Sequence, residues 1–112
     1  MVQELEIIDL VVGGGQEAVK GMIVTTHYIG WLEDGTKFDA SLDRGQYFEF
    51  ILGANQVIKG WDQGIVGMKV GGKRKLIIPS HLAYGKRKMG KVIPANANLT
   101  FEITLYDVQK RK

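Results

Sequence analysis

The chain of 112 residues contains no cysteine, two histidines and two prolines. The lack of cysteine excludes disulfides, thiolate metal sites and a thiolate nucleophile. The two histidines, His27 and His81, are too few to predict a metal cage. The sequence also has no apolar run of about twenty residues and no N-terminal targeting segment, so we expect no membrane contact and a cytoplasmic location. The same features would fit a domain cut from a longer exported protein.

Length and composition are those of a globular protein, and we expect a single domain over residues 1–112. Hydrophobic residues make up 45% of the chain and charged residues 24%, as is usual for soluble proteins. The net charge is +3, and Lys-Arg-Lys triplets occupy residues 73–75, 86–88 and 110–112. We interpret the triplets as solvated surface, with an acidic or nucleic-acid partner as the alternative. Nucleic-acid binding is disfavoured because no aromatic residues alternate with the triplets to form a stacking platform.

Fifteen glycines divide the rest of the chain into short segments, several of which have the two-residue periodicity of β-strands. Residues 99–108 show it most clearly, because apolar and polar side chains alternate throughout. Asp34-Gly35 is a hairpin turn signal, and Pro79 ends a strand because it has no N–H to donate. The predicted strands are Leu5–Val12, Met22–Leu32, Lys37–Ala40, Tyr47–Leu52, Gly72–Ile78 and Leu99–Val108.

Only residues 56–68 have helical periodicity, with apolar residues on one face. Asn55 is the expected N-cap and Gly67 the expected residue after the C-terminus. Gly60 and Gly64 each cost a helix about 1 kcal/mol relative to alanine, so we expect burial of Trp61 to stabilise it. We therefore predict an α+β fold, in which an antiparallel sheet of about five strands packs its dry face on one short helix.

Several common catalytic arrangements are excluded or disfavoured. Residues 13–18 fit the dinucleotide pattern G-x-G-x-x-A, but the pattern requires a following helix and residues 23–28 are strand-like, which favours a flexible turn. No serine lies in a G-x-S-x-G elbow. Asp39 and Asp43 could form a carboxylate pair, although local turn bonding is the simpler interpretation.

What remains is a set of aromatic and aliphatic residues drawn from nearly every segment. Its members are Tyr28, Phe38, Phe48, Val57, Ile58, Trp61, Tyr84, Ile93 and Phe101. The simplest interpretation is a hydrophobic core. However, Tyr84 and Ile93 belong to residues 80–98, a long segment without predicted structure that must bury its apolar residues or expose a patch. Folding over the mouth of an aromatic cleft would satisfy that requirement.

Several of these residues occur in motifs that follow one another in order along the chain. The motifs are Val57-Ile58-x-Gly60-Trp61, His27-Tyr28-x-Gly30-x-Leu32-x-Asp34-Gly35-x-x-Phe38-Asp39, Ala83-Tyr84-Gly85, Ile93-Pro94 and Leu99-x-Phe101. In this respect the chain resembles the FKBP-type peptidyl-prolyl cis–trans isomerases, the macrolide-binding immunophilins. The resemblance implies a twisted five-stranded antiparallel sheet wrapped around one short helix. It also implies an enzyme without cofactor or metal that assists protein folding by rotating X–Pro bonds.

The resemblance further implies site residues and partners. The catalytic residues would be Tyr28, Phe38, Asp39, Tyr84 and Phe101. The residues binding substrate or macrolide would be Arg44, Phe48, Gln56, Val57, Ile58, Trp61, Met89, Val92 and Ile93. Trp61 would form the floor of a proline pocket, and the Ile58 N–H and the Tyr84 hydroxyl would each hold a substrate carbonyl. The expected partners are proline-containing polypeptides and macrolides such as tacrolimus and rapamycin, bound by a monomer.

An alternative function within the same family is a binding module without catalysis, because several members work in that way. The sequence departs from the family pattern at the tip of the long segment, where residues 86–91 read Lys-Arg-Lys-Met-Gly-Lys, and at Ala95, which replaces a proline. These departures concern the choice of substrate and leave the predicted pocket floor unchanged.

Overall fold

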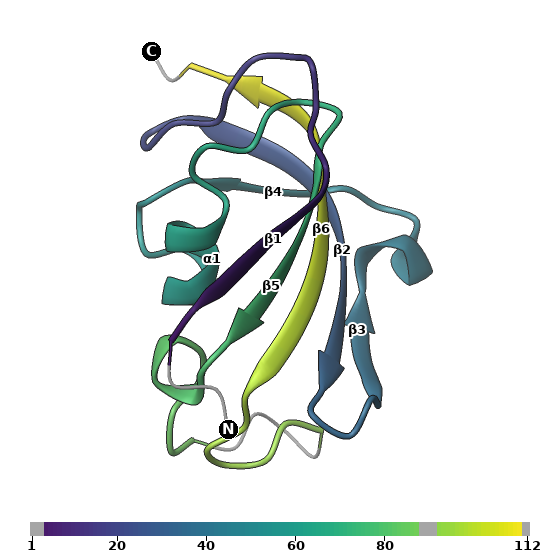
Figure 1. Cartoon of the computed structure of the whole chain (residues 1–112), viewed down its shortest axis with the longest axis vertical. Coiled ribbons are helices and arrows are strands. Elements are labelled where there is room, and N and C mark those ends of the chain that lie inside the picture. The colour runs from purple at the N-terminus through teal and green to yellow at the C-terminus, as the bar shows by residue number, and fades with distance from the viewer. Residues whose placement is uncertain (1–3, 88–91, 111–112) are drawn as a thin grey trace.

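The computed structural model describes residues 4–87 and 92–110 (Figure 1). Six strands and one α-helix account for most of its regular structure, and two short 3-10 helices, η1 and η2, lie between them. The strands are β1 (Glu6–Val11), β2 (Ile23–Leu32), β3 (Lys37–Ala40), β4 (Phe48–Ile51), β5 (Lys73–Ile78) and β6 (Leu99–Gln109). The helices are α1 (Lys59–Gly64), η1 (Ser41–Arg44) and η2 (Ser80–Leu82). The predicted α+β class is confirmed.

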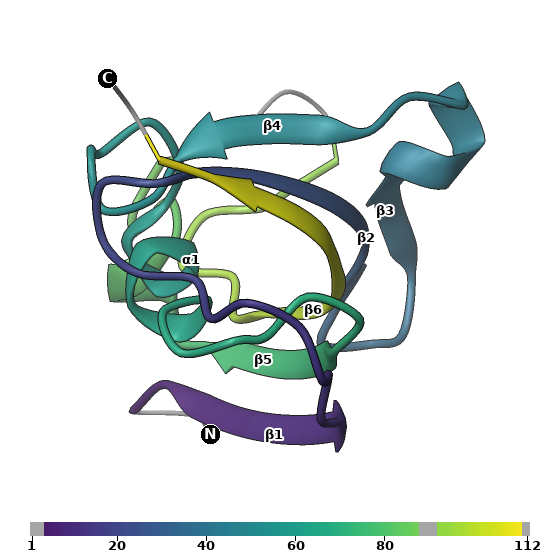
Figure 2. The same cartoon turned by 90° about the horizontal axis from the view of Figure 1, so that it is seen from above.

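All six strands belong to one antiparallel sheet with the order β1-β5-β6-β2-β3. β6 pairs with β2 along its whole length, so β3 and β4 share the other edge of β2. β3 pairs with the second half of β2, and β4 pairs with the first half of β2. Six strands therefore fill five positions, which reconciles the sheet with the expected number of about five. Seen from above, the sheet curls around α1 (Figure 2).

The predicted helix is too long. α1 contains six residues, and Asn55, the expected N-cap, lies outside it in the left-handed region at φ 58°. The residue that precedes the helix is Ile58, which makes no side-chain capping bond. Instead the Asp62 carboxylate, inside the helix, accepts hydrogen bonds from the N–H groups of Gly53 (2.8 Å) and Asn55 (3.1 Å). These bonds hold the preceding segment as a turn and stop the helix from starting earlier.

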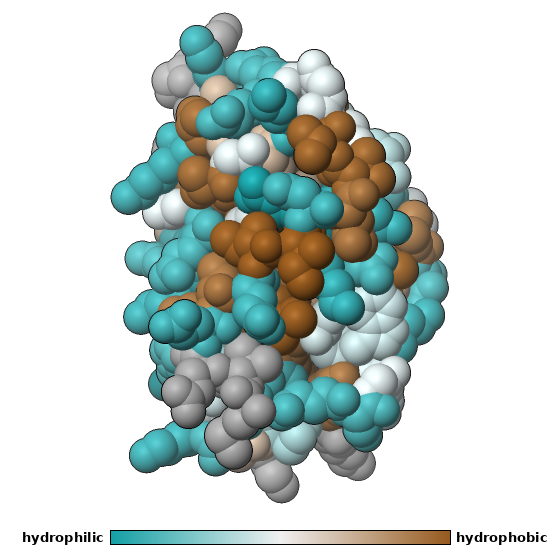
Figure 3. All heavy atoms as spheres, viewed as in Figure 1, coloured by the Kyte–Doolittle hydropathy of each residue, from teal (hydrophilic) through white to brown (hydrophobic). Residues whose placement is uncertain are grey.

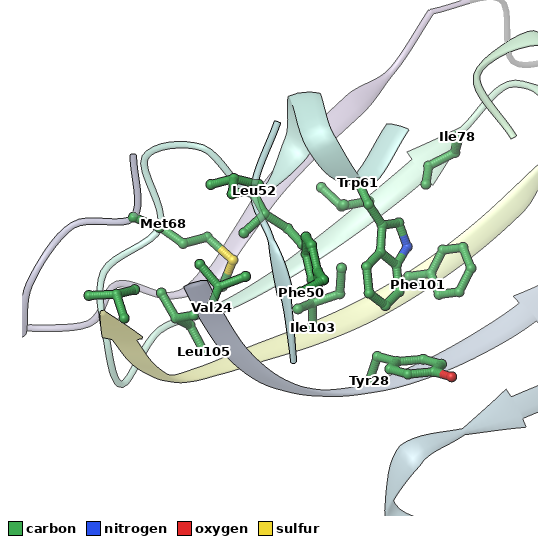
Figure 4. Packing of buried hydrophobic residues seen from close by; sticks show 14 of the residues in the cluster. Val24, Tyr28, Phe50, Leu52, Trp61, Met68, Ile78, Phe101, Ile103 and Leu105 are labelled. Carbon is green, nitrogen blue, oxygen red and sulfur yellow. The ribbon is translucent and has the colours of Figure 1, made fainter. Parts of the chain in front are cut away.

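The core lies between α1 and the concave face of the sheet (Figure 4). Two glycines allow the close contact between α1 and β5. A Cβ atom on Gly60 would lie 2.5 Å from Ile78 Cγ2, and one on Gly64 would lie 2.7 Å from Leu76 Cδ1. The lack of a side chain at both positions therefore lets α1 pack closely on β5. Burial of Trp61 beside them offsets the low helix propensity of the segment.

β1 is the edge strand of the sheet, and all six of its residues are exposed. Its apolar side chains lie over the middle of the face seen in Figure 3. The pairing register with β5 shifts between Asp9 and Val11, so Leu10 is the extra residue of a β-bulge. Such a bulge interrupts a sheet edge and limits pairing with other chains.

The described parts of residues 80–98 are more ordered than a structureless loop. Backbone N–H groups donate from Gly85 to Ser80 (2.8 Å) and from Asn96 to Gly85 (2.7 Å). The buried Asn98 side chain accepts a bond from the Ser80 N–H at 2.8 Å. These contacts fix the segment that contains Tyr84 against the end of the sheet. In the described ranges, no helix is long and apolar enough to span a bilayer.

Candidate functional site

One cavity of about 170 Å³ opens between the N-terminal end of α1 and the concave face of the sheet. β2, β3, β4, α1 and β6 all contribute side chains to it, as does the segment after η2. The residues that line the cavity are Tyr28, Phe38, Asp39, Phe48, Gln56, Val57, Ile58, Trp61, Tyr84 and Phe101. Most of these side chains are aromatic or aliphatic, so the cavity suits an apolar group of modest size.

Trp61 forms the inner end of the cavity, with only 4% of its surface exposed. Phe101 stands nearly perpendicular to the indole, with ring centroids 5.2 Å apart, and Tyr28 meets it edge-on at 4.9 Å. The buried indole N–H has no hydrogen-bond partner among the described residues. Figure 4 shows the indole nitrogen on the side that faces Phe101, an arrangement that allows a weak N–H···π contact. The ring is therefore held by packing, not by a hydrogen bond.

A small polar network closes one side of the cavity. The Tyr28 hydroxyl donates to Asp39 Oδ2 at 2.6 Å, and Arg44 donates to the Tyr28 hydroxyl at 2.7 Å. Arg44 also forms an ion pair with Asp39. Burial alone would raise the pKa of Asp39, but the hydrogen bonds from Tyr28 and Arg44 outweigh it, and the pKa lies below its ordinary value. Asp39 is therefore a carboxylate at neutral pH, and it fixes the Tyr28 hydroxyl.

Two further polar side chains line the cavity from other segments. Burial and the nearby charge of Asp39 raise the pKa of the Tyr84 hydroxyl, so it is protonated at neutral pH and able to donate. The Gln56 side chain is held at the rim, because its Oε1 accepts a bond from the Ile51 N–H at 2.8 Å. The cavity thus has an apolar interior with hydrogen-bonding groups at its edge.

The structure brings together ten of the fourteen predicted site residues as the wall of this cavity. Arg44 contacts the wall through Tyr28 and Asp39. Ile93 is instead buried in the hydrophobic core with 7% exposure, and Val92 is 52% exposed; neither lines the cavity. Met89 lies outside the described residues. The neighbouring Ile93 and Val92 have opposite environments, which the sequence motif does not predict.

One supporting residue was missed by the sequence analysis. Ser41 is fully buried, and its hydroxyl accepts a bond from the Tyr28 N–H and lies 2.8 Å from His27 Nδ1. It therefore fixes the backbone of Tyr28, whose side chain lines the cavity. Serine in a turn region gives no sequence signal for such a role, because its usual function there is local capping.

The other candidate chemistries find no support in the described residues. Residues 13–15 form part of a connection and precede no helix, and no described group of three or more His, Asp or Glu side chains could hold a metal ion. Two members of the 73–75 triplet are engaged in the sheet. Lys73 pairs with Glu102, and Arg74 pairs with Asp9. That triplet is therefore not a free basic patch.

Known proteins share this fold and much of this sequence. A sequence model described as FKBP-type peptidyl-prolyl cis-trans isomerase matches residues 14–106. The FK506-binding protein of Neisseria meningitidis serogroup A is 61% identical over 104 residues, which cover 93% of this chain and 95% of that protein. Peptidyl-prolyl cis-trans isomerase FKBP2 of Homo sapiens is 54% identical over 92 residues, or 82% of this chain and 65% of the relative.

A solved structure agrees with these relatives. The crystal structure of AtFKBP13 aligns with a TM-score of 0.88 and 45% sequence identity, over 94% of this chain and 93% of that one. The chain belongs to the FKBP-type peptidyl-prolyl cis–trans isomerase family, as its motifs predicted.

Proposed function

We propose that this chain catalyses cis–trans isomerisation of X–Pro bonds in polypeptides that insert a prolyl ring into the aromatic cavity. The observation that supports the proposal most directly is the cavity itself, apolar inside and lined by Trp61, Tyr28 and Phe101. A prolyl ring is a compact apolar group, and the polar groups at the rim suit the amides on either side of it.

The reaction requires little chemistry from the protein. Amide resonance sets a rotation barrier of about 18–20 kcal/mol, and X–Pro bonds interconvert in tens to hundreds of seconds without a catalyst. The twisted transition state loses resonance, so its carbonyl oxygen and nitrogen carry less charge than in the planar amide. An apolar cavity favours this less polar state over the planar amide, which water solvates better.

Hydrogen bonds at the rim would hold the flanking chain while the prolyl bond rotates. Ile58 is the N-cap of α1, where N–H groups have no intrahelical acceptor, so its N–H can donate to a substrate carbonyl. The protonated Tyr84 hydroxyl, in the segment after η2, supplies a second donor. Because the two hydrogen bonds hold the substrate chain in place, the motion within the site is rotation about the X–Pro bond.

Replacement of Tyr84 by phenylalanine tests the proposal. The variant keeps the aromatic wall and removes one donor, so we expect kcat/KM for a prolyl tetrapeptide to fall roughly two- to tenfold, the value of one hydrogen bond. The measurement is NMR exchange spectroscopy on the peptide, without a coupling protease. Tyr106→Phe is the matched control, because Tyr106 is exposed and does not line the cavity.

The same assay separates the enzyme from a binding module. Turnover by the wild-type chain, and its inhibition by rapamycin, supports catalysis in the cavity. Tight rapamycin binding without turnover of any prolyl peptide would contradict the proposal and favour a module that only binds.

We also propose that tacrolimus and rapamycin occupy this cavity and that the protein assists folding steps limited by prolyl isomerisation. Trp61 lies at the inner end of the cavity, so its fluorescence should respond to either macrolide in a Trp31→Phe background. Acceleration of a prolyl-limited refolding phase in a second protein, lost on addition of rapamycin, tests the folding role. An unchanged Trp61 signal at saturating macrolide would show that the ligand binds elsewhere.

A further inference from the structure

The residues after Tyr84 form a turn that is fixed at the rim of the cavity. Tyr84 lines the cavity, and its carbonyl accepts a bond from the Arg87 N–H at 3.1 Å. Such a turn keeps its first and fourth Cα atoms within about 7 Å of each other. Gly85, at φ 60°, is bonded on both sides, to Ser80 and to Asn96. Lys86 and Arg87 therefore follow a residue of the cavity wall in a fixed turn, although neither of them lines the cavity.

Lys86 and Arg87 have no acidic partner within the part of the chain that the structure describes. Both residues are exposed, and within residues 4–87 and 92–110 neither forms an ion pair. The other charged groups at the rim, Asp39 and Arg44, pair with each other. The 86–87 pair thus differs from the 73–75 triplet, in which Lys73 and Arg74 have acidic partners. The turn after Tyr84 therefore carries two positive charges without an acidic partner among the described residues.

We propose that Lys86 and Arg87 make the cavity select X–Pro bonds that are flanked by Asp or Glu. The inference rests on the proposed isomerase function and names its substrate class. Adjacent residues are about 3.8 Å apart along a chain, so a side chain next to a bound proline lies at the rim. The charges of the turn can act on that side chain through solvent over distances comparable with the Debye length, which is about 10 Å at 0.1 M salt.

The test compares capped peptides Ala-Glu-Pro-Phe and Ala-Gln-Pro-Phe, which have nearly the same shape and differ by one charge. NMR exchange spectroscopy gives kcat/KM for each. We expect the Glu peptide to be favoured roughly three- to fivefold at an ionic strength of about 20 mM, and the preference to approach unity at about 500 mM. A Lys peptide should be the poorest substrate at low salt.

Two double variants separate the local charge from the net charge of the protein. Lys86→Gln with Arg87→Gln should abolish the preference for Glu and change the Gln-peptide rate by no more than about twofold. Lys20→Gln with Lys110→Gln removes the same two charges from exposed positions outside the cavity wall. This control should retain the preference for Glu.

The outcomes distinguish the inference from the function on which it rests. Equal rates for the Glu and Gln peptides at low salt, or loss of the preference in the Lys20 and Lys110 control, would overturn the role of Lys86 and Arg87 and leave the isomerase proposal intact. Absence of turnover of every peptide would overturn both. A preference that disappears only in the Lys86 and Arg87 variant supports the inference.

Discussion

Asp39 illustrates how a single residue can be assigned a position in the site. The sequence left two interpretations, a catalytic residue implied by the family resemblance and a carboxylate that bonds within a local turn. In the structure its side chain bonds to Tyr28 and Arg44 at the cavity. The neighbouring turn is instead held by Asp34, whose Oδ1 accepts a bond from the Thr36 N–H at 2.9 Å. The contacts of Asp39 are therefore with the rim.

Replacement of Asp39 by asparagine should have an effect that depends on pH. The pKa of Asp39 is lower in the folded than in the unfolded state, so its ionised form adds stability above the unfolded pKa. That contribution is lost as the pH falls through the folded pKa. We expect Asp39→Asn to lower the free energy of unfolding by about 0.5–1 kcal/mol at neutral pH, a value reduced by solvent screening.

Urea unfolding of both proteins from about pH 7 to pH 3 measures this difference, which should shrink toward the acid end. Asp43→Asn is the control, because Asp43 pairs with Lys37 on the surface with both side chains well exposed; it should change stability by less than about 0.5 kcal/mol. If the effect of Asp39→Asn is the same at both pH values, the charge of Asp39 contributes nothing to it.

Among the elements, strands were easier to predict than the helix. Alternation along residues 99–108 identified β6 and its buried side chains, because apolar residues at every second position of a strand lie on the same face of the sheet. The helix was predicted too long, because the hydrogen bonds that the Gly53 and Asn55 N–H groups donate to Asp62 depend on the three-dimensional path of the turn. The sequence also could not show that β3 and β4 share one edge of β2, since that arrangement depends on pairing register.

The contact between α1 and β5 gives a prediction at this scale. Gly60→Ala should raise helix propensity by about 1 kcal/mol and yet destabilise the protein by about 1–3 kcal/mol. Three atoms of Ile78 would lie less than 3.0 Å from the new Cβ atom. Ile78 is fully buried, and its branched side chain has few alternative rotamers. Chemical denaturation of the purified variant measures the change.

Two companion variants show whether the close contact is the cause. Lys59→Ala, at an exposed position of the same helix, should change stability by less than about 0.5 kcal/mol. In the double variant Gly60→Ala with Ile78→Ala, the new methyl group fits into the vacated space, so the two costs should not add. Additive costs would show that Gly60 matters through its backbone and not through its contact with Ile78.

At the scale of the whole molecule, the cavity is an unfilled part of the hydrophobic core. Tyr28, Trp61 and Phe101 belong to both. The alternation of apolar and polar residues could predict that such residues face inward. It could not show whether they fill a core or line a cavity, because both give the same alternation. The family motifs, and not the alternation, indicated which inward side chains surround open space. They did not resolve how Val92 and Ile93 divide between surface and core, because those environments depend on the fold of the whole loop.

This shared packing predicts that the cavity and the sheet unfold together. In a Trp31→Phe background, urea transitions followed by Trp61 fluorescence and by far-UV circular dichroism should coincide, with a slope of about 1–1.5 kcal/mol per molar urea. Rapamycin at about 100 times its dissociation constant should shift both transitions equally, by about 2.7 kcal/mol. A fluorescence change at lower urea than the loss of strand signal would mean that Trp61 leaves its place while the sheet persists. The aromatic wall would then be a separate unit, and the cavity would not depend on the core that surrounds it.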